Sequence, residues 1–126
     1  MRRLAMRKIR IFVYGTLKRG FYNHYLIQNE KFLGEHCIYG YTLYEVPGFA
    51  YPFMVKSDGG FVKGEVWEVA MDVFEIIRRM EESAGYRVKS IGRNLFAFVF
   101  PKSRLPKNAL VIGCEWHKTD REVKGS

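Results

Sequence analysis

The chain has 126 residues, which is enough for one domain with a modest core and too few for two. Hydrophobic residues make up 48% of it and aromatic residues 16%, a composition that favours a folded, β-rich domain and excludes a largely disordered protein. The net charge of +8 could attract nucleic acid, an anionic membrane or a small acidic substrate, and charge alone does not distinguish these partners.

Targeting segments and metal motifs are not visible in the sequence. No stretch is long and apolar enough to span a bilayer, and no signal-type hydrophobic segment follows the basic N-terminus. Cys37 and Cys114 match no metal spacing, and reduced thiols are expected, although a disulfide between them stays open. The other potential ligands, His24, His36 and His117, are scattered. We expect a cytoplasmic protein with no membrane partner and no metal.

Composition divides the chain into three parts. The sequence predicts a loose basic leader at residues 1–8, a single folded domain at 9–118 and a polar tail at 119–126. No internal repeat and no linker interrupts the domain.

Most of the domain is predicted as β-strands. Runs rich in β-branched and aromatic residues indicate strands at residues 10–14, 38–46, 53–55, 61–69, 86–91, 95–100 and 110–116. The run Ser57, Asp58, Gly59 and Gly60 predicts a hairpin turn between the third and fourth of them. Asn23 is a predicted cap for a short helix after the first strand.

One long helix follows the strand at residues 61–69. Asp72 is its predicted N-cap, Glu75 stands in capping-box position, and Gly85 is a plausible stop. An apolar stripe recurs at helical spacing: Val73, Ile76, Ile77, Met80 and Ala84. Sequential strands with one main and one short helix predict an α+β fold, built on a small mixed, mostly antiparallel sheet or an open barrel.

Glu81 is the candidate catalytic residue of this helix. At about 100° per residue it falls between Phe74 and Ile77, whereas Glu82 falls on the opposite side. A carboxylate that faces apolar surroundings has a raised pKa and becomes a better base near neutral pH. The same pattern also fits a boundary carboxylate paired with Arg or Lys.

The turn that follows the first strand is the second candidate feature. A strand that ends in Gly15 can leave consecutive N–H groups unpaired, and such groups bind a carboxylate or a developing oxyanion. An ordinary turn would give the same sequence pattern.

Residues 12–20, FVYGTLKRG, followed by Asn23 and His24, resemble the opening signature of the γ-glutamylcyclotransferase-like family, which includes γ-glutamylamine cyclotransferases and AIG2-like proteins. The resemblance continues in order through further segments: FLG at 32–34, GYTLY at 40–44, Pro52, VKGEVWEV at 62–69 and the helix end with Tyr86. It covers nearly the whole chain apart from the leader and the last few residues.

The resemblance implies an enzyme that cyclises the glutamyl part of a γ-glutamyl compound to 5-oxoproline and releases an amine. Glu81 matches the family's glutamate and would be the general acid/base, and no metal or organic cofactor is required. The substrate-binding residues implied are Tyr14, Gly15, Thr16, Leu17, His24, Pro52 and Tyr86.

The chain departs from the family pattern around this glutamate. Ile77 and Arg78 replace a Leu-Asp pair, Glu82 replaces a Gly, and Val88 replaces an Arg. These departures bear on substrate choice more than on the carboxylate. Neither the leaving amine nor the oligomeric state follows from the sequence.

Two other functions remain open at this stage. A non-catalytic binding member of the same family would keep the pocket without the reaction. An RNA-binding module is the other, because the chain is basic and residues 11–13 and 96–99 echo paired aromatic strand motifs. Those two segments lack the flanking residues of the motifs and lie far apart, so no nucleic-acid partner is expected.

Overall fold

The computed structural model of the protein describes residues 7–117; the predicted tail at 119–126 and the first six residues of the predicted leader lie outside this part. In chain order the elements are β1 (Lys8–Val13), the 3₁₀ helix η1 (His24–Leu26), β2 (Lys31–Glu45), β3 (Phe53–Ala70), α2 (Met71–Ser83), β4 (Arg87–Gly92), β5 (Leu95–Val99), the 3₁₀ helix η2 (Lys102–Arg104) and β6 (Leu110–Val111). None of the helices in the described part is long and apolar enough to cross a membrane.

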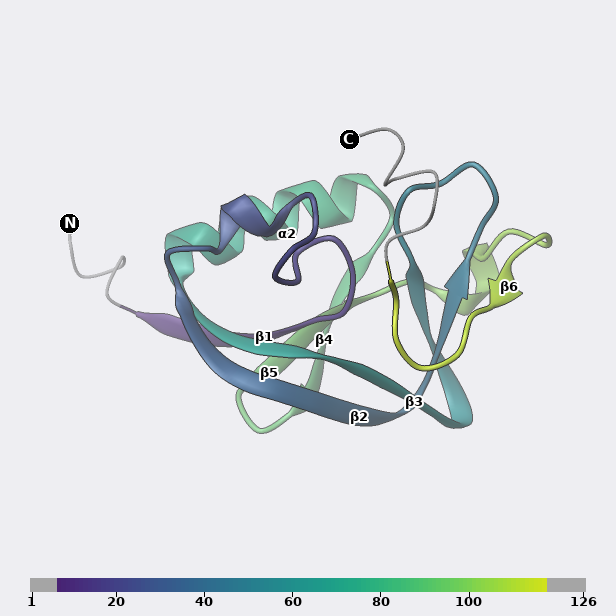
Figure 1. The fold of residues 1–126 in the computed structure, drawn as a ribbon, viewed down its shortest axis with the longest axis horizontal. Helices are drawn as coiled ribbons and strands as arrows, with labels where there is room; N and C mark the ends of the chain where they lie inside the picture. The colour runs from purple at the N-terminus through teal and green to yellow at the C-terminus, as the bar shows by residue number, and fades with distance from the viewer. Residues whose placement is uncertain (1–6, 118–126) are drawn as a thin grey trace.

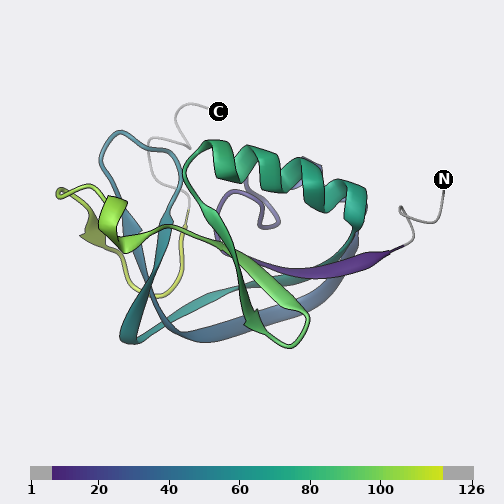
Figure 2. The same ribbon diagram turned by 180° about the vertical axis from the view of Figure 1, so that it is seen from behind.

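The strands form one sheet in the order β4-β5-β1-β3-β2-β6. Every neighbouring pair is antiparallel except β1 and β5, which are parallel. The sheet curves strongly, and α2 lies across its hollow side together with the loop between β1 and η1 (Figures 1 and 2). The structure therefore confirms the predicted α+β class with a mixed, mostly antiparallel sheet.

The buried apolar side chains form two clusters that meet along β1. Ile11 belongs to the cluster that contains Phe74 and Ile77 of α2. Phe12 belongs to the other cluster, with Leu43 of β2. This division follows from the alternation of side chains along a strand. Because β1 contributes to both clusters, the turn at its end is held between them.

The two aromatic segments that echo an RNA-binding module do lie side by side. Ile11 of β1 pairs with Phe96 of β5 in the parallel ladder. However, Phe12 is only 1% exposed and Phe98 only 4%. These rings are part of the core and form no exposed surface on which bases could stack.

The predicted hairpin turn at residues 57–60 is wrong. β3 runs without interruption through this segment, and β2 stays paired with it across a bulge between Tyr39 and Tyr41. Gly59, with φ of 102°, takes up the irregularity, and Ser57 contacts Thr42 of β2 through a hydroxyl–hydroxyl hydrogen bond of 2.6 Å. The turn-forming residues thus mark a kink in one long strand, because glycines also occur at bulges.

The predicted start of the long helix is also wrong. Ala70 still pairs with Lys8 of β1, so the strand continues to the residue at which the helix begins. The Met71 N–H donates to the carbonyl of Arg7, and Asp72 lies in the first turn without acting as a cap. The predicted stop is confirmed, because Gly85 follows the helix with φ of 102°.

Four smaller differences concern the bounds of the strands and the face of the helix. β2 begins at Lys31, seven residues before the predicted start at 38, and β6 ends at Val111, before Gly113 turns the chain at φ of 89°. Ile76, expected in the apolar stripe, is 56% exposed, and the buried residues of α2 are Phe74 and Ile77. Lys8, expected in the leader, is the first residue of β1.

Candidate active site

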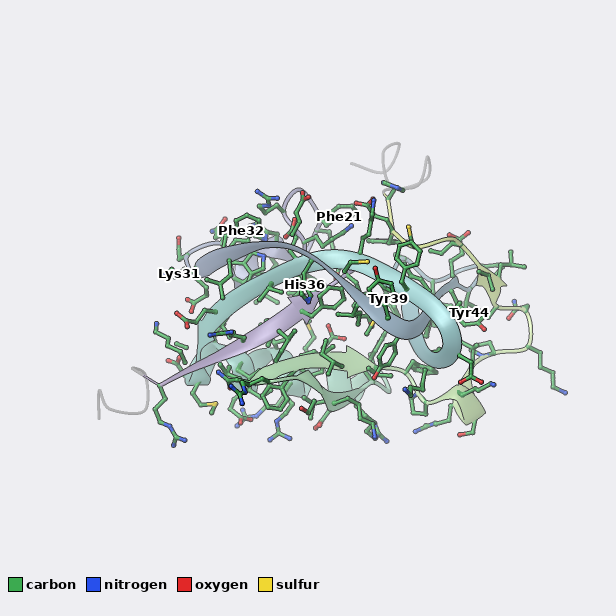
Figure 3. The ribbon with its side chains drawn as sticks, turned by 90° about the horizontal axis from the view of Figure 1, so that it is seen from below. Phe21, Lys31, Phe32, His36, Tyr39 and Tyr44 are labelled. Carbon is green, nitrogen blue, oxygen red and sulfur yellow. The ribbon has the colours of Figure 1, made fainter. Side chains whose placement is uncertain are left out.

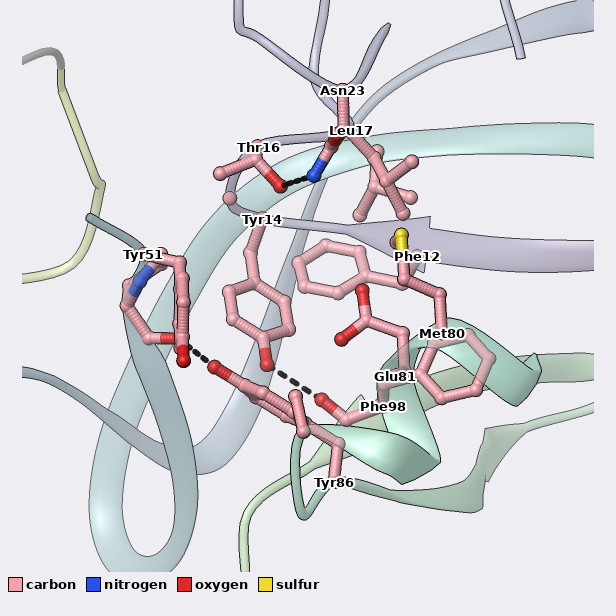
Figure 4. A pocket seen from close by; sticks show the side chains of 14 residues that line it. Phe12, Tyr14, Thr16, Leu17, Asn23, Tyr51, Met80, Glu81, Tyr86 and Phe98 are labelled. Atoms are coloured by element: carbon pink, nitrogen blue, oxygen red, sulfur yellow. Dashed lines mark hydrogen bonds between the residues drawn. The ribbon is translucent and has the colours of Figure 1, made fainter. Parts of the chain in front are cut away.

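A cavity of about 120 Å³ lies where the end of β1, the segment before β3 and the last turn of α2 meet (Figure 4). Most of its lining is aromatic or apolar, with one ionisable carboxylate. The lining residues are Phe12, Val13, Tyr14, Gly15, Thr16, Leu17, Asn23, Tyr51, Pro52, Met80, Glu81, Ala84, Tyr86 and Phe98. The structure thus brings together all the predicted site residues except His24.

The turn at residues 14–17 is shaped by a close approach to Pro52. A Cβ atom on Gly15 would lie 2.9 Å from the Pro52 ring, so only glycine fits here without a shift. The turn is closed by hydrogen bonds from the Lys18 N–H to the carbonyl of Gly15 and from the Asn23 N–H to the carbonyl of Thr16. Within residues 7–117, the N–H groups of residues 15–17 donate to no protein acceptor. They are available to an anion.

Glu81 projects from the last turn of α2 into this cavity (Figure 4). Among the described residues its carboxylate has no hydrogen-bond or ion-pair partner. Burial raises its pKa from 4.5 to about 7. In contrast, Glu75 and Glu82 both pair with Arg78, at 3.0 and 3.4 Å. The helix therefore presents one unpaired carboxylate to the cavity and keeps its paired ones outside.

Two tyrosine hydroxyls lie near this carboxylate, and each donates a hydrogen bond to a backbone carbonyl. Tyr14 donates to the carbonyl of Phe98 and Tyr86 to the carbonyl of Pro52, each at 2.6 Å. Burial, followed by the nearby charge of Glu81, raises the pKa of Tyr14. Burial also raises the pKa of Tyr86 well above its ordinary value. Both therefore remain protonated phenols, and neither can act as a base near neutral pH.

His24 is the predicted site residue that the structure does not bring to the cavity. Its Nδ1 lies 2.9 Å from the carbonyl oxygen of Leu17, and its ring packs edge-on against Trp67. It therefore contacts the turn through the carbonyl of Leu17 and does not line the cavity.

Sequence reasoning missed two polar lining residues. Asn23 was expected as a helix cap, yet its amide donates to the Thr16 hydroxyl at 2.9 Å, and η1 has no side-chain cap. Its position in the family-like opening segment was a usable signal. Tyr51 carries no such signal, because it lies in an irregular segment that only the fold brings to the cavity.

The groups in the cavity can support a limited range of reactions. It offers one base of near-neutral pKa, a row of free N–H groups for an anion and apolar walls that exclude water. Within residues 7–117, no group of three or more His, Cys, Asp or Glu side chains is placed to hold a metal ion.

Comparison with known proteins assigns the chain to a family. A family model described as "Gamma-glutamyl cyclotransferase, AIG2-like" matches residues 11–118. The chain belongs to this family. A relative from Pyrococcus horikoshii that carries the name "Putative gamma-glutamylcyclotransferase" is 43% identical over 86 residues, which are 68% of this chain and 70% of the relative.

Solved structures agree with this assignment to the γ-glutamyl cyclotransferase, AIG2-like family. The crystal structure of the same Pyrococcus protein is similar with a TM-score of 0.65 and 32% identity, covering 90% of this chain and 87% of that one. An AIG2-like protein from Mus musculus has a TM-score of 0.76 at 21% identity, with 90% of both chains covered. The mouse protein shares the fold, which is all that this level of identity shows.

Proposed function

We propose that the protein is an enzyme that acts on a small γ-glutamyl compound, cyclises its glutamyl part to 5-oxoproline and releases an amine. The observation that carries this proposal is the unpaired Glu81 carboxylate, whose pKa is raised to about 7, in the same cavity as the free N–H groups of residues 15–17. The family supports the substrate class, since its model is that of a γ-glutamyl cyclotransferase. The reaction needs a base and an anion site, and the unpaired Glu81 carboxylate and the free N–H groups support these two roles.

The first step in the proposed mechanism is folding of the substrate chain onto itself. The N–H groups of residues 15–17 bind the α-carboxylate, so that the α-amine lies against the γ-carbonyl carbon. Holding the two reacting groups in this geometry can lower the barrier by about 7–11 kcal/mol at best. The apolar walls, which include Phe12 and Met80, keep water away from the γ-carbonyl.

Glu81 then moves the proton. It takes a proton from the α-ammonium, because –NH₃⁺ has no lone pair for attack. The amine nitrogen forms a bond to the γ-carbon and gives a tetrahedral intermediate. Glu81 returns this proton to the leaving nitrogen as the bond between that nitrogen and the γ-carbon breaks, and it then carries the second proton that the ring nitrogen loses to the departing amine. The products are 5-oxoproline and an ammonium ion of the released amine, and atoms and charge balance without a cofactor.

The test compares two neighbouring carboxylates. Glu81→Gln keeps the shape and removes the base, so we expect 5-oxoproline formation to fall by about 10²-fold or more across a panel of γ-glutamyl compounds. Substrate affinity should change far less, because the amides hold the α-carboxylate. Released 5-oxoproline is measured directly in a single-turnover and a steady-state assay.

Glu82→Gln is the matched control, since Glu82 is paired with Arg78 outside the cavity. Its rate should stay close to that of the parent. Loss of turnover in Glu82→Gln with full activity in Glu81→Gln would contradict the assignment of the base. An inactive parent on the whole panel would favour the non-catalytic binding protein over the enzyme.

A further inference from the structure

Outside the first cavity, the described part of the chain has two buried charged side chains, Lys18 and Glu65, and neither takes part in the proposed reaction. Lys18 is 5% exposed and Glu65 is 7% exposed. Burial of a charge is costly unless the charge is paired and hydrogen-bonded. Lys18 belongs to the loop that begins at Gly15 and Glu65 bonds to it, so the contacts that offset this cost also hold the loop.

Glu65, in β3, forms hydrogen bonds to the loop. Its Oε1 accepts hydrogen bonds from the backbone N–H of Arg19 and from Nε1 of Trp67, both at 3.1 Å. Its Oε2 accepts from Nε of the same Arg19 side chain, also at 3.1 Å. The Arg19 guanidinium in turn lies 3.9 Å from the centre of the Phe32 ring. The backbone and the side chain of one loop residue are thereby fixed by one buried carboxylate.

Lys18 holds the loop to a segment distant in sequence. Its Nζ donates to the carbonyl of Trp116 at 2.8 Å and lies 4.0 Å from a carboxylate oxygen of Glu115. It also lies over the ring of Phe21, at 4.8 Å from the centre. Burial lowers the pKa of Lys18, an effect that the neighbouring carboxylates oppose. Adjacent loop residues are therefore anchored in two directions.

Lys18, Arg19 and Glu65 line a second cavity, distinct from the candidate active site. Residues 14–17 line the first cavity, whereas Lys18, Arg19 and Phe21 line the second. Figure 3 views the sheet from below and labels Phe21 and His36, both of which line this second cavity. The cations in its lining, Lys18, Arg19 and Lys63, are matched by the carboxylates Glu35, Glu65 and Glu115. Such a balanced set neutralises itself and leaves no excess charge to attract a ligand.

We propose that Glu65 and Lys18, acting through the loop at residues 18–19, are positioning residues that hold the N–H groups of residues 15–17 in place for the substrate's α-carboxylate. The proposal rests on the proposed function. On the other side of the turn, Gly15 is fixed by its approach to Pro52. The amides between these fixed points are pre-organised, and a bound carboxylate then does not have to order them.

The experiment changes Glu65 and compares it with the other carboxylate that contacts the same guanidinium. Glu65→Gln removes the charge and keeps the shape. Glu35→Gln is the matched control, because Glu35 lies 3.7 Å from Arg19 with its side chain 82% exposed. A third variant, Arg19→Met, changes a side chain that is 46% exposed and so tests the same contact without altering a buried residue.

Two readouts are measured on each variant: KM and kcat for a γ-glutamyl substrate, and backbone ¹⁵N order parameters of Thr16 and Leu17. In Glu65→Gln and in Arg19→Met we expect KM to rise about tenfold or more, since a hydrogen bond to a charged group is lost. Values of kcat should change far less, because Glu81 is untouched. The order parameters should fall in both variants and stay at the parent value in Glu35→Gln.

The proposal is overturned if, in an active parent, KM and the order parameters do not change together in Arg19→Met and in a folded Glu65→Gln. It is also overturned if Glu35→Gln has the same effect as Glu65→Gln. A parent that turns over no γ-glutamyl compound contradicts the proposed function instead. In that case the order parameters alone decide whether Glu65 holds the loop, and values unchanged from the parent reject this positioning role.

Discussion

At the residue scale, Glu81 combines a charge with surroundings that disfavour it. The carboxylate lies among apolar and phenolic side chains, with no cation and no hydrogen-bond donor bonded to it within residues 7–117. A structural carboxylate in such a place would normally be paired. Burial keeps its pKa near 7, where a group can both take and return a proton. The same burial has a cost for the stability of the fold.

This cost predicts a pH-dependent gain in stability for Glu81→Gln. In the parent, the pKa of Glu81 is about 7 when folded and 4.5 at its ordinary value, so the folded state binds the proton more tightly. The contribution of this group to the free energy of unfolding is full below pH 4.5 and is lost as the pH rises through 7. We therefore expect the free energy of unfolding of Glu81→Gln to exceed that of the parent by about 1–3 kcal/mol at pH 8, after allowance for partial exposure.

Urea denaturation of both proteins between pH 4 and pH 9 measures this difference. The gain should disappear towards pH 4, where the parent carboxyl is protonated in both states. Glu82→Gln should show no gain at any pH, because it removes a carboxylate that is paired with Arg78. A difference between Glu81→Gln and the parent that is independent of pH would contradict a raised pKa.

The contact between Gly15 and Pro52 predicts a second effect at a single residue. In Gly15→Ala the new methyl group would lie 2.9 Å from the ring, so the turn must move away from it. We expect a loss of about 1–3 kcal/mol in the free energy of unfolding and a weaker affinity for the substrate carboxylate. Gly92→Ala is the control, since its nearest contact, Leu95, lies at an ordinary 3.7 Å. Thermal unfolding measures the stability of both variants, and ligand titration measures their affinity for the substrate carboxylate.

At the scale of elements, α2 positions Glu81 by packing one of its sides into the core. Phe74 stacks on Phe98 of β5 with ring centres 5.9 Å apart, and Ile77 is fully buried one turn before Glu81. The end of the helix is fixed by the N–H groups of Ala84 and Tyr86, which both donate to the carbonyl of Glu81. The direction of the Glu81 side chain thus depends on packing at positions 74 and 77.

Adjacent isoleucines allow this dependence to be measured. Ile77→Ala should lower the free energy of unfolding by about 2–5 kcal/mol, because it leaves a cavity under the helix. Ile76→Ala should change it little, because Ile76 is 56% exposed. Urea denaturation at one pH gives both values. Equal effects of the two variants would contradict the helix orientation described here.

The elements also show why sequence patterns predicted the strands better than their ends. The periodicity around β1, β5 and α2 reports local burial, and those elements appear close to the expected residues. The turn residues Ser57 and Gly59 gave the wrong result because a glycine-rich segment serves a bulge as well as a hairpin. Asp72 failed as a cap because the ladder between β1 and β3 reaches Ala70, a tertiary pairing that no local signal contains.

At the scale of the whole molecule, the candidate site combines residues that the sequence predicts with residues that it does not. Helical periodicity and the family-like motifs both selected Glu81, and the opening signature selected the turn at 14–17. Tyr51 and the support from Glu65 could not be found in this way. Their roles depend on which distant segments become neighbours, and one sequence does not report that. His24 shows the converse, since a motif residue faces Trp67 behind the turn.

The distance in sequence between the turn and its anchors has a consequence for biosynthesis. The hydrogen bond from Tyr14 to Phe98 spans 84 positions, and that from Lys18 to Trp116 spans 98. A ribosome that adds about 5–20 residues per second needs roughly 5–20 s to travel from Lys18 to Trp116. Throughout that interval the nascent chain carries the turn at residues 14–17 without the support from Trp116. A translation product that stops just before residue 116 would therefore contain every residue that lines the cavity and still lack the carbonyl that binds Lys18.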